Sequence, residues 1–369
     1  MTGSADASIK ERLVTDDTAT SPSSQKILES EPGHKSSISG KEVIMLSSNN
    51  YLGLASHPRV KRASQEAIER YGCSTGAARR LGGLTAIQKK LEEELAKFKS
   101  TDSAVVFTSG YTANVGTIQA LMGKEDVIFS DELNHASIVD GCRLSGARVE
   151  VFPHCDTVAL ECSLASSKAR KKLVVTDSVF SMNGDIAPIP DLVRLAGEFK
   201  ASLMVDDAHA TGVLGEHGGG CLDHFHLEGQ AEVVMGTLGK ALGSVGGFIA
   251  GSSRLTEFLE SKGRSILFTT ALPPAAVAAS LEALMVIREE PELRRKLWRN
   301  TTFFRGRLKR NGLHLLAGET PIIPIIVGET SDAERLAGVL FSKGIFVSRV
   351  GYPYVPEGQA RLRTIVSAQ

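Results

Sequence analysis

Short apolar runs alternate with longer amphipathic stretches along most of this chain, starting at Val43. Most of these runs, such as residues 104–107 and 203–205, are continuously apolar, as expected for strands that helices cover on both faces. The stretches between them are long enough to form helices that connect parallel strands. The alternation therefore predicts an α/β fold built on a mostly parallel sheet.

The predicted elements divide into a large group and a small one. Apolar runs predict strands at residues 104–107, 127–129, 149–152, 173–176, 203–205, 233–236 and 248–250. Helical periodicity predicts helices at residues 86–98, 112–122, 138–145, 191–199 and 253–262, and then at 274–287 and 292–311. The last part of the chain predicts a small β-α-β unit, with apolar runs at 322–327, 345–347 and 361–365 and a helix at 333–342.

These groups define the expected domains. Residues 1–42 are rich in Ser, Thr and charge, and a segment with so few large apolar residues cannot offset its ordering entropy, so we expect a flexible tail. Residues 43–288 form the expected large domain, and residues 289–369 form a smaller C-terminal domain. The chain ends directly after a predicted strand and leaves one face of it uncovered, so we expect the small domain to be truncated.

The charge balance and the apolar pattern exclude two classes of function. The chain has 42 Lys and Arg against 42 Asp and Glu, unlike the basic surface of a nucleic-acid-binding protein. Its longest apolar stretch, residues 272–287, is interrupted by prolines and a glutamate and is too short to cross a membrane. The five cysteines are scattered without a Cys-x-x-Cys pair, which predicts reduced thiols and a cytoplasmic location.

Polar and charged residues follow several of the predicted strands. Asp206, Asp207 and His209 follow one strand, and Lys240 lies in the glycine-rich turn after the next strand. The first strand of the large group runs through a Ser-Gly turn into a helix, whose N-terminal N–H groups suit a phosphate. Ligands of open α/β sheets bind beyond the C-terminal strand ends, so we expect these groups to converge on one site.

Each of these features also has a simpler explanation. The two aspartates and His209 could cap the segment that follows them, and Lys240 alone could be a solvated loop residue. A nucleotide-binding loop is not indicated, because Ala241 replaces the Ser or Thr of a Walker motif and no G-x-G-x-x-G follows the first strand. The histidines between residues 209 and 226 lack the spacing of metal ligands and have no cysteine partners, so no metal site is predicted.

The combination is more specific than its parts. An amine that can form a Schiff base, an acid that can pair with a pyridinium nitrogen and a helix-start phosphate site are what pyridoxal phosphate requires. The sequence resembles the α-oxoamine synthases, pyridoxal phosphate enzymes that condense an amino acid with an acyl-CoA, in five ordered motifs: residues 49–54 (NNYLGL), 131–137 (DELNHAS), 179–184 (VFSMNG), 206–212 (DDAHATG) and 236–243 (GTLGKALG). The resemblance spans about residues 43–368 and implies a fold-type I transferase with a large sheet domain and a smaller α+β C-terminal domain.

The resemblance also implies roles for residues at the motif positions. Lys240 would hold the cofactor and move the substrate α-proton, Asp206 would keep the pyridine nitrogen protonated, and His135 would stack on the ring. Asn49 and Arg363 would hold the substrate, with Arg363 binding its carboxylate, although Arg363 taken alone could be a surface residue of a strand. The other implied cofactor contacts are Gly110, Tyr111, Ser181, His209, Thr237 and Thr269, of which Thr269 would reach the site of the other subunit and so implies a homodimer.

Other functions stay open at this point. An aminotransferase would use the same lysine and aspartate without a CoA site, and a non-catalytic protein could keep the fold. Within the resemblance, residues 268–274 and 74–79 look more like 8-amino-7-oxononanoate synthases, whereas residues 351–364 look more like 2-amino-3-oxobutyrate CoA ligases. The sequence therefore does not decide between alanine and glycine, or between acyl-CoA substrates.

Overall fold

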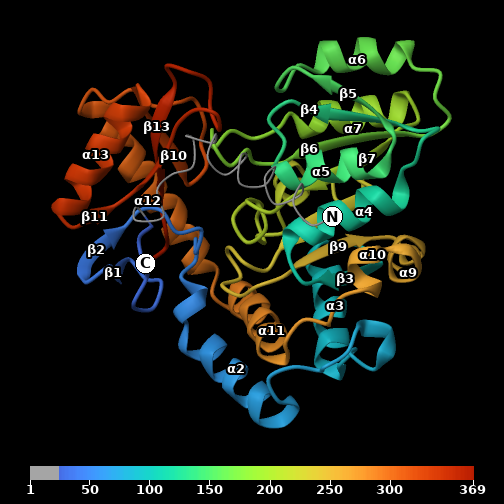
Figure 1. The fold of residues 1–369 in the computed structure, drawn as a ribbon, viewed down its shortest axis with the longest axis horizontal. Coiled ribbons are helices and arrows are strands. Elements are labelled where there is room, and N and C mark those ends of the chain that lie inside the picture. The colour runs from blue at the N-terminus through green and yellow to red at the C-terminus, as the bar shows by residue number, and fades with distance from the viewer. Residues whose placement is uncertain (1–24) are drawn as a thin grey trace, which may run out of the picture.

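The computed structural model describes residues 25–369, and its largest element is a seven-stranded sheet (Figure 1). Its strands lie in the order β3 (Ser103–Phe107), β9 (Gly247–Gly251), β8 (Val233–Thr237), β7 (Ser202–Asp206), β6 (Lys172–Asp177), β4 (Val127–Asp131) and β5 (Arg148–Phe152). The strands from β8 to β5 are parallel, whereas β9 is antiparallel to both of its neighbours. The mostly parallel sheet expected from the sequence is confirmed.

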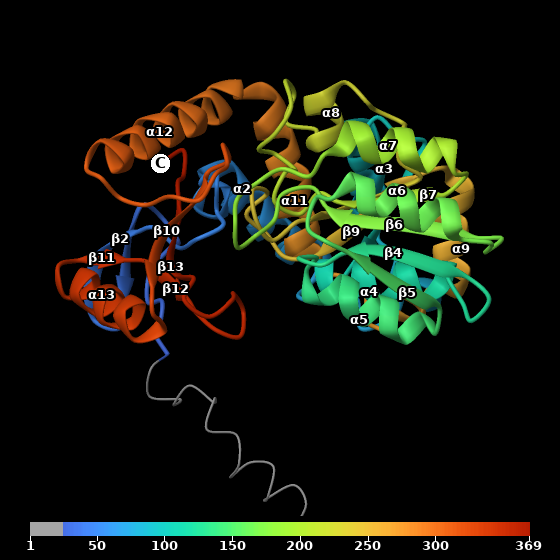
Figure 2. The same cartoon turned by 90° about the horizontal axis from the view of Figure 1, so that it is seen from above.

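Helices cover both faces of this sheet, because successive side chains of each strand point into two different apolar cores (Figure 2). Val174 and Val205 belong to one core, together with side chains of α3 (Ala86–Phe98), α6 (Thr157–Ser166), α7 (Ile189–Glu198) and α11 (Pro274–Glu289). Val175 and Met204 belong to the other, with α4 (Gly110–Leu121), α5 (Ala136–Ser145), α9 (Ser253–Lys262) and α10 (Arg264–Leu267). Polar side chains are thus left to the loops at the strand ends.

The smaller domain lies beside the sheet and is connected to it by the long helix α12 (Pro291–Arg310) (Figure 1). Its strands β10 (Ile322–Gly328), β13 (Ala360–Ile365) and β12 (Ser348–Val350) form an antiparallel sheet in that order, and α13 (Thr330–Ser342) packs against it. The predicted β-α-β order is therefore present in β10, α13 and β12, whose two strands run parallel to each other, but β13 pairs between the two strands. Apolar runs do not specify strand direction, and here the segment at 351–359 reverses the chain between β12 and β13.

Residues 25–42 contradict the expected flexible tail, while residues 1–24 of that tail lie outside the described part of the chain. β1 (Lys35–Ile38) and β2 (Lys41–Met45) form a hairpin, and its turn residues Ser39 and Gly40 both have positive φ, 47° and 76°. β2 also pairs with β11 (Ile345–Phe346) from the C-terminal part of the chain. Composition underestimates order here because a distant strand supplies the backbone hydrogen bonds.

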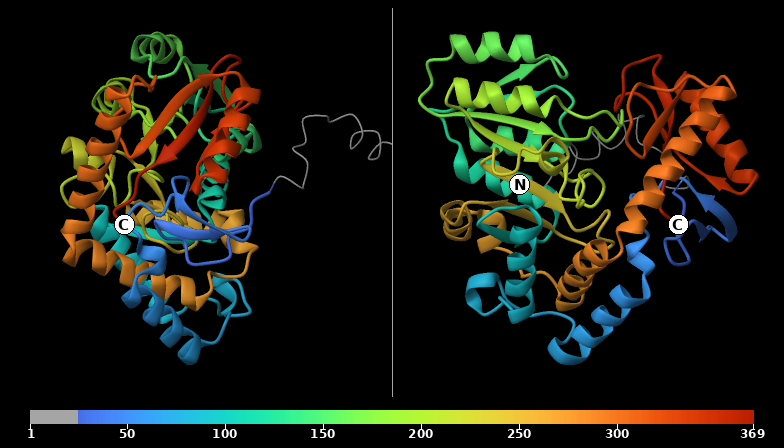
Figure 3. Two further views of the ribbon diagram at one scale, coloured as in Figure 1. Left: turned by 90° about the vertical axis from the view of Figure 1, so that its left-hand side faces the viewer. Right: turned by 180° about the vertical axis from the view of Figure 1, so that it is seen from behind.

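One long helix was not predicted from the sequence. α2 (Pro58–Tyr71) packs along α11 and connects the hairpin to the large domain (Figure 3). Its buried residues are few, Val60 and Ala67, and most of its other side chains are polar or charged, so the segment contains no apolar run. Among residues 25–369, no helix has both the length and the apolar character needed to span a membrane.

Candidate active site

The C-terminal ends of β3, β4, β6, β7 and β8 surround a cavity of about 160 Å³. Its walls are formed by Gly110, Tyr111, Asn114, His135, Ser137, Asp177, Ser181, Asp206, Ala208, His209, Met235, Thr237 and Lys240. These include every cofactor contact that the resemblance implies except Thr269. The structure thus brings side chains from separate loops to one point.

Asp206, the last residue of β7, is buried at this cavity and is held by neutral donors. Asn114 Nδ2 lies 2.7 Å from Asp206 Oδ2, and the Ala208 N–H donates to Asp206 Oδ1 over 2.9 Å. Asn114 also donates to Ser137 Oγ at 2.8 Å, while its own Oδ1 is buried without a partner among the described residues. Asp206 is therefore fixed in orientation by groups that leave its charge available to a cationic ligand.

Lys240 lies in the loop after β8, is partly exposed and lines the same cavity. Within residues 25–369, no carboxylate oxygen lies within 4.0 Å of its amine. Burial lowers the pKa of Lys240 to about 8, and the charge of Arg363 adds to that effect, while Asp206 and Asp177 oppose it. At pH 7 about a tenth of the amine is therefore uncharged, a far larger fraction than for an ordinary lysine, as a nucleophilic lysine requires.

His209 is buried, and its ring is oriented by Tyr51. Burial, together with the charges of Lys240 and Arg363, lowers the pKa of His209 well below 6.5, so the ring is neutral. Its Nδ1 lies 2.7 Å from Tyr51 Oη, and burial raises the pKa of Tyr51, so that the phenol keeps its proton and donates it to Nδ1. The neutral ring then carries its own proton on Nε2, which becomes a donor for a ligand.

Helix α4 begins at the wall of the cavity. Ser109 and Thr112 form a reciprocal capping box, each accepting the other's backbone N–H at 3.1 Å. The N–H groups of Gly110 and Tyr111, the first two residues of the helix, are orphan donors of the kind that binds phosphate. A Cβ at Gly110 would lie 2.8 Å from Met235 Cε, so a larger residue here would require that flexible side chain to shift.

His135 precedes α5 and presents an exposed ring at the cavity. Its Nδ1 lies 2.7 Å from Ser137 Oγ, and its backbone N–H donates to Asp177 Oδ2 at 2.8 Å. Burial and the neighbouring Asp206 raise the pKa of Asp177 well above its usual value. Asp177 therefore supports the His135 loop, and its burial beside Asp206 disfavours its charged form.

Arg363 and Asn49 lie together next to Ser181 on the cavity wall. Arg363 Nε donates to the Ser181 carbonyl at 2.5 Å, and its Nη2 lies 3.4 Å from Asn49 Oδ1. Arg363 is 7% exposed, so the alternative of a surface arginine is wrong. Arg361, on the same strand, is 1% exposed and donates to Asn183 Oδ1 at 2.8 Å, so it is a buried structural residue.

Thr269 does not reach this cavity within its own chain. It lines a separate space of about 20 Å³ beside Arg79 and Gln88. The next residue, Thr270, pairs with Ala78 in an isolated β-bridge, which ties this segment to the loop before α3. The structure of one chain therefore separates Thr269 from the other residues of the implied cofactor site.

Four further residues at or beside the cavity were not predicted from the sequence: Tyr51, Asn114, Ser137 and Asp177. Tyr51 and Ser137 lie inside the motifs that carry the resemblance, so a signal for them was present. Asn114 lies one turn into α4, and its contact with Asp206 depends on how that helix packs over the sheet. Sequence spacing does not show such a contact.

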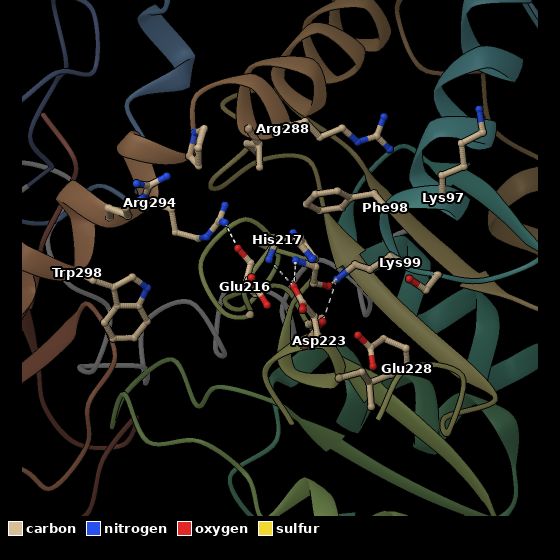
Figure 4. Close-up of a pocket in the computed structure, with 18 of the residues that line it drawn as sticks. Lys97, Phe98, Lys99, Glu216, His217, Asp223, Glu228, Arg288, Arg294 and Trp298 are labelled. Carbon is tan, nitrogen blue, oxygen red and sulfur yellow. Dashed lines mark hydrogen bonds and ion pairs between the residues drawn. The ribbon is translucent and has the colours of Figure 1, made fainter. Parts of the chain in front are cut away.

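A much larger cavity, of about 1400 Å³, is lined by Asp207, the residue after Asp206. Lys99 also lines this cavity (Figure 4). Lys99 Nζ lies 2.8 Å from Asp207 Oδ2, and both side chains are buried. Arg288 makes a 2.5 Å ion pair with Glu94 at the edge of the same cavity. Most of its lysines and arginines are thus paired with carboxylates of the same chain.

The aminotransferase class I and II family matches residues 41–369, which include every residue of the small cavity. The chain belongs to the aminotransferase class I and II family. Among members of this family with known activity, 8-amino-7-oxononanoate synthase of Thermoanaerobacter pseudethanolicus is 52% identical over 344 residues, covering 93% of this chain and 87% of the relative.

Solved structures agree with this placement in the aminotransferase class I and II family. A structure of SPT (serine palmitoyltransferase) with PLP has a TM-score of 0.92 and 33% identity, covering 99% of this chain and 92% of that one. The 8-amino-7-oxononanoate synthase of Francisella tularensis has a TM-score of 0.77 and 30% identity, with coverage of 89% and 92%. The expected membership of the α-oxoamine synthases, and their fold, are confirmed.

Proposed function

We propose that this chain is a pyridoxal phosphate-dependent C-acyltransferase that condenses a small amino acid with an acyl-CoA, most like 8-amino-7-oxononanoate synthase in biotin biosynthesis. The observation that carries the proposal is the convergence of Lys240, Asp206 and His209 on one cavity, in a chain that is 52% identical to such an enzyme. A reactive amine, an unpaired carboxylate and a neutral imidazole donor are the groups that this cofactor needs.

The residues of the cavity fit pyridoxal phosphate. Lys240 would attach its aldehyde, and Asp206 would pair with its ring nitrogen. His209 would donate from Nε2 to the phenolic oxygen, His135 would cover the ring, and Ser181 would lie beside it. The donors for the phosphate would be the backbone N–H groups of Gly110 and Tyr111 and the hydroxyl of Thr237.

Pyridoxal phosphate, when bound, supplies an electron sink for a carbanion at the amino acid Cα. The protein would then position the substrate and move protons. Arg363 and Asn49 would hold the substrate carboxylate, since Arg363 uses Nε for Ser181 and keeps other donors for a ligand. Lys240, whose pKa is lowered to about 8, is suited to accept and return a proton at Cα.

The related enzymes are named after their product, and the carbon skeleton of that product indicates which substrates to expect. In 8-amino-7-oxononanoate, the seven carbons up to the ketone correspond to a pimeloyl group, and the amine-bearing carbon and its methyl group correspond to alanine without its carboxylate. The balanced reaction therefore joins alanine to pimeloyl-CoA and releases free CoA and carbon dioxide. We propose this pair ahead of other small amino acids and acyl chains.

The test is a CoA-release assay of the cofactor-loaded protein with glycine, alanine and serine against acetyl-, succinyl- and pimeloyl-CoA. We expect the highest kcat/KM for alanine with pimeloyl-CoA. The alternative, a 2-amino-3-oxobutyrate CoA ligase, is favoured by the segment at 351–364 and predicts glycine with acetyl-CoA instead. Amino-group transfer without CoA release would contradict both and indicate an aminotransferase.

We also propose that the active protein is a homodimer in which Thr269 completes the phosphate site of the other subunit. Two observations support this arrangement: Thr269 lies outside the cavity of its own chain, and the neighbouring Phe268 and Leu81 are 75% and 79% exposed. Mixing inactive Lys240→Ala protein with inactive Thr269→Ala protein should restore part of the activity, because some mixed dimers contain one intact site. No recovery after subunit exchange would contradict the shared site.

A further inference from the structure

His154 follows β5 and lies between two carboxylates from different loops. Its Nδ1 is 3.0 Å from Asp131 Oδ1, and its Nε2 is 2.6 Å from Asp185 Oδ2. The ring packs edge-on against Phe180, with 4.3 Å between ring centroids, and its side chain is only 19% exposed. His154 has no part in the chemistry proposed above.

The contacts identify the protonation state of His154. A carboxylate only accepts hydrogen bonds, so both ring nitrogens must donate, and the ring is an imidazolium. Burial alone would lower its pKa, but the hydrogen bonds to Asp131 and Asp185 raise the pKa of His154 to about 12. Cys155 lies close enough to form a metal-like cluster with Asp131 and His154, but a doubly protonated ring has no lone pair for a metal.

One end of this bridge is firmly anchored. Asp131 is the last residue of β4, and its two oxygens also accept backbone N–H groups from Leu133 at 2.9 Å and Cys155 at 2.8 Å. The other end is not. Asp185 Oδ1 is buried without a partner among the described residues, so the position of the Asp185 carboxylate depends on His154.

Asp185 is the last residue of a turn at residues 181–185, where the two domains meet. Two backbone hydrogen bonds close this turn: the Phe180 N–H donates to the Asp185 carbonyl, and the Gly184 N–H donates to the Phe180 carbonyl. Its carbonyls accept from the small domain: the Ser181 carbonyl from Arg363 Nε at 2.5 Å, and the Gly184 carbonyl from Thr320 Oγ1 at 2.7 Å. The position of the turn therefore sets the position of the Arg363 guanidinium.

We propose that His154 is a positioning residue: it fixes the turn at 181–185 to the end of β4 and thereby orients Arg363 toward the substrate carboxylate. The proposal rests on the function proposed above for Arg363. It predicts that loss of His154 weakens amino acid binding without a comparable effect on acyl-CoA.

The test compares His154→Asn with His57→Asn in the cofactor-loaded enzyme. His57 is a matched control, because its side chain is 21% exposed, faces Glu290 at 3.7 Å and makes no hydrogen bond or ion pair with residues 181–185 in the described part of the chain. We expect His154→Asn to raise the amino acid KM about tenfold, with changes under about threefold in kcat and acyl-CoA KM.

In an Arg363→Ala background, the additional effect of His154→Asn on the amino acid KM should disappear. Equal effects on both KM values, or additive effects of the two substitutions, would overturn the proposal.

A second readout needs no activity. Hydrogen exchange of the cofactor-free protein should show faster exchange of the amides at 180–186 in His154→Asn, and also in Asp185→Asn, which leaves the ring in place if the first variant folds poorly. His57→Asn should leave these amides unchanged. Unchanged exchange in both His154→Asn and Asp185→Asn would overturn the inference, even if the enzyme proves to be an acyltransferase. A wild-type protein that releases no CoA would count against the proposed function alone.

Discussion

The two cavities beside the end of β7 differ in size and in how their charges are used. Asp206 lines the small one, of about 160 Å³, and Asp207 lines the large one, of about 1400 Å³ (Figure 4). Asp207 is neutralised by Lys99 at 2.8 Å and also accepts the Cys221 N–H at 3.2 Å. Asp206 accepts only from neutral donors, and Lys240 across the small cavity has no partner carboxylate within 4.0 Å in residues 25–369.

The volume of a cavity is therefore a poor guide to whether its charged groups are available to a ligand in this protein. A buried ion pair such as Lys99 with Asp207 has its charges compensated within the fold and offers little to a ligand. A lysine whose pKa is lowered to about 8 beside an uncompensated aspartate is poised to react. Neighbouring residues of one strand end thus serve stability on one side and chemistry on the other.

The strongest prediction from this comparison concerns the lysines. Lys240→Ala should abolish turnover and also the covalent attachment of the cofactor that borohydride traps, because no other amine of residues 25–369 lines the small cavity. Lys97→Ala, at the rim of the large cavity and with a 64% exposed side chain, should keep both properties. Peptide mapping that finds the reduced cofactor on another lysine would contradict the assignment.

The adjacent aspartates provide a sharper version of the same contrast. Asp206→Asn should lower kcat on the order of a thousandfold or more with little change in Tm, because a neutral amide cannot hold the ring nitrogen protonated. Asp207→Asn should instead leave Lys99 buried without its counter-charge and cost about 3 to 5 kcal/mol of unfolding free energy. Chemical denaturation and single-turnover rates, measured on both variants, separate the two effects. The comparison fails if Asp207→Asn is the variant with normal stability and lost chemistry.

Arg363→Ala should raise the amino acid KM and lower kcat, with little change in acyl-CoA KM. Loss of a charge-assisted pair in a partly dry site costs about 2 to 5 kcal/mol, or roughly 30-fold to several thousandfold in kcat/KM. Arg361 is too deeply buried to serve as a neutral control, because it donates to Asn183 and the Met182 carbonyl. Arg349→Ala is the better control, since Arg349 lies on the adjacent strand and is 30% exposed. Equal losses in the two variants would argue against a specific carboxylate contact.

The sequence predicted the sheet and the residues that line the small cavity for the same physical reason. Buried parallel strands are continuous apolar runs, and the polar residues of the cavity lie at their C-terminal ends, as Asp206 does at the end of β7. What the sequence could not show depends on contacts between distant segments. The pairing of β2 with β11, the antiparallel order of the small sheet and the contact of Asn114 with Asp206 all join parts of the chain that share no local pattern.

A pH effect follows from the lowered pKa of Lys240. Only the uncharged amine attacks an aldehyde, so capture of the cofactor by the cofactor-free protein should speed up about tenfold per pH unit and level off near pH 8. An ordinary lysine would level off only near its usual pKa of 10.5. Because Arg363 lowers this pKa and Asp206 raises it, Arg363→Ala should move the plateau to higher pH and Asp206→Asn to lower pH. Stopped-flow absorbance measures the profile, and a plateau that does not move in either variant would show that these charges do not act on Lys240.

The smallest expected effect concerns Tyr51, which touches the cavity only through His209. Tyr51→Phe removes the donor at 2.7 Å from Nδ1, and the ring then loses its preference for the tautomer with the proton on Nε2. One neutral hydrogen bond contributes about 0.5 to 1.5 kcal/mol, so kcat/KM should fall roughly threefold to tenfold, with the cofactor still attached. Tyr354→Phe is the control, because Tyr354 is 79% exposed and outside the cavity. Tyr51→Phe could instead match this control in kcat/KM and in the pH dependence of the bound-cofactor absorbance. That result would show that a group other than the Tyr51 phenol orients the His209 ring.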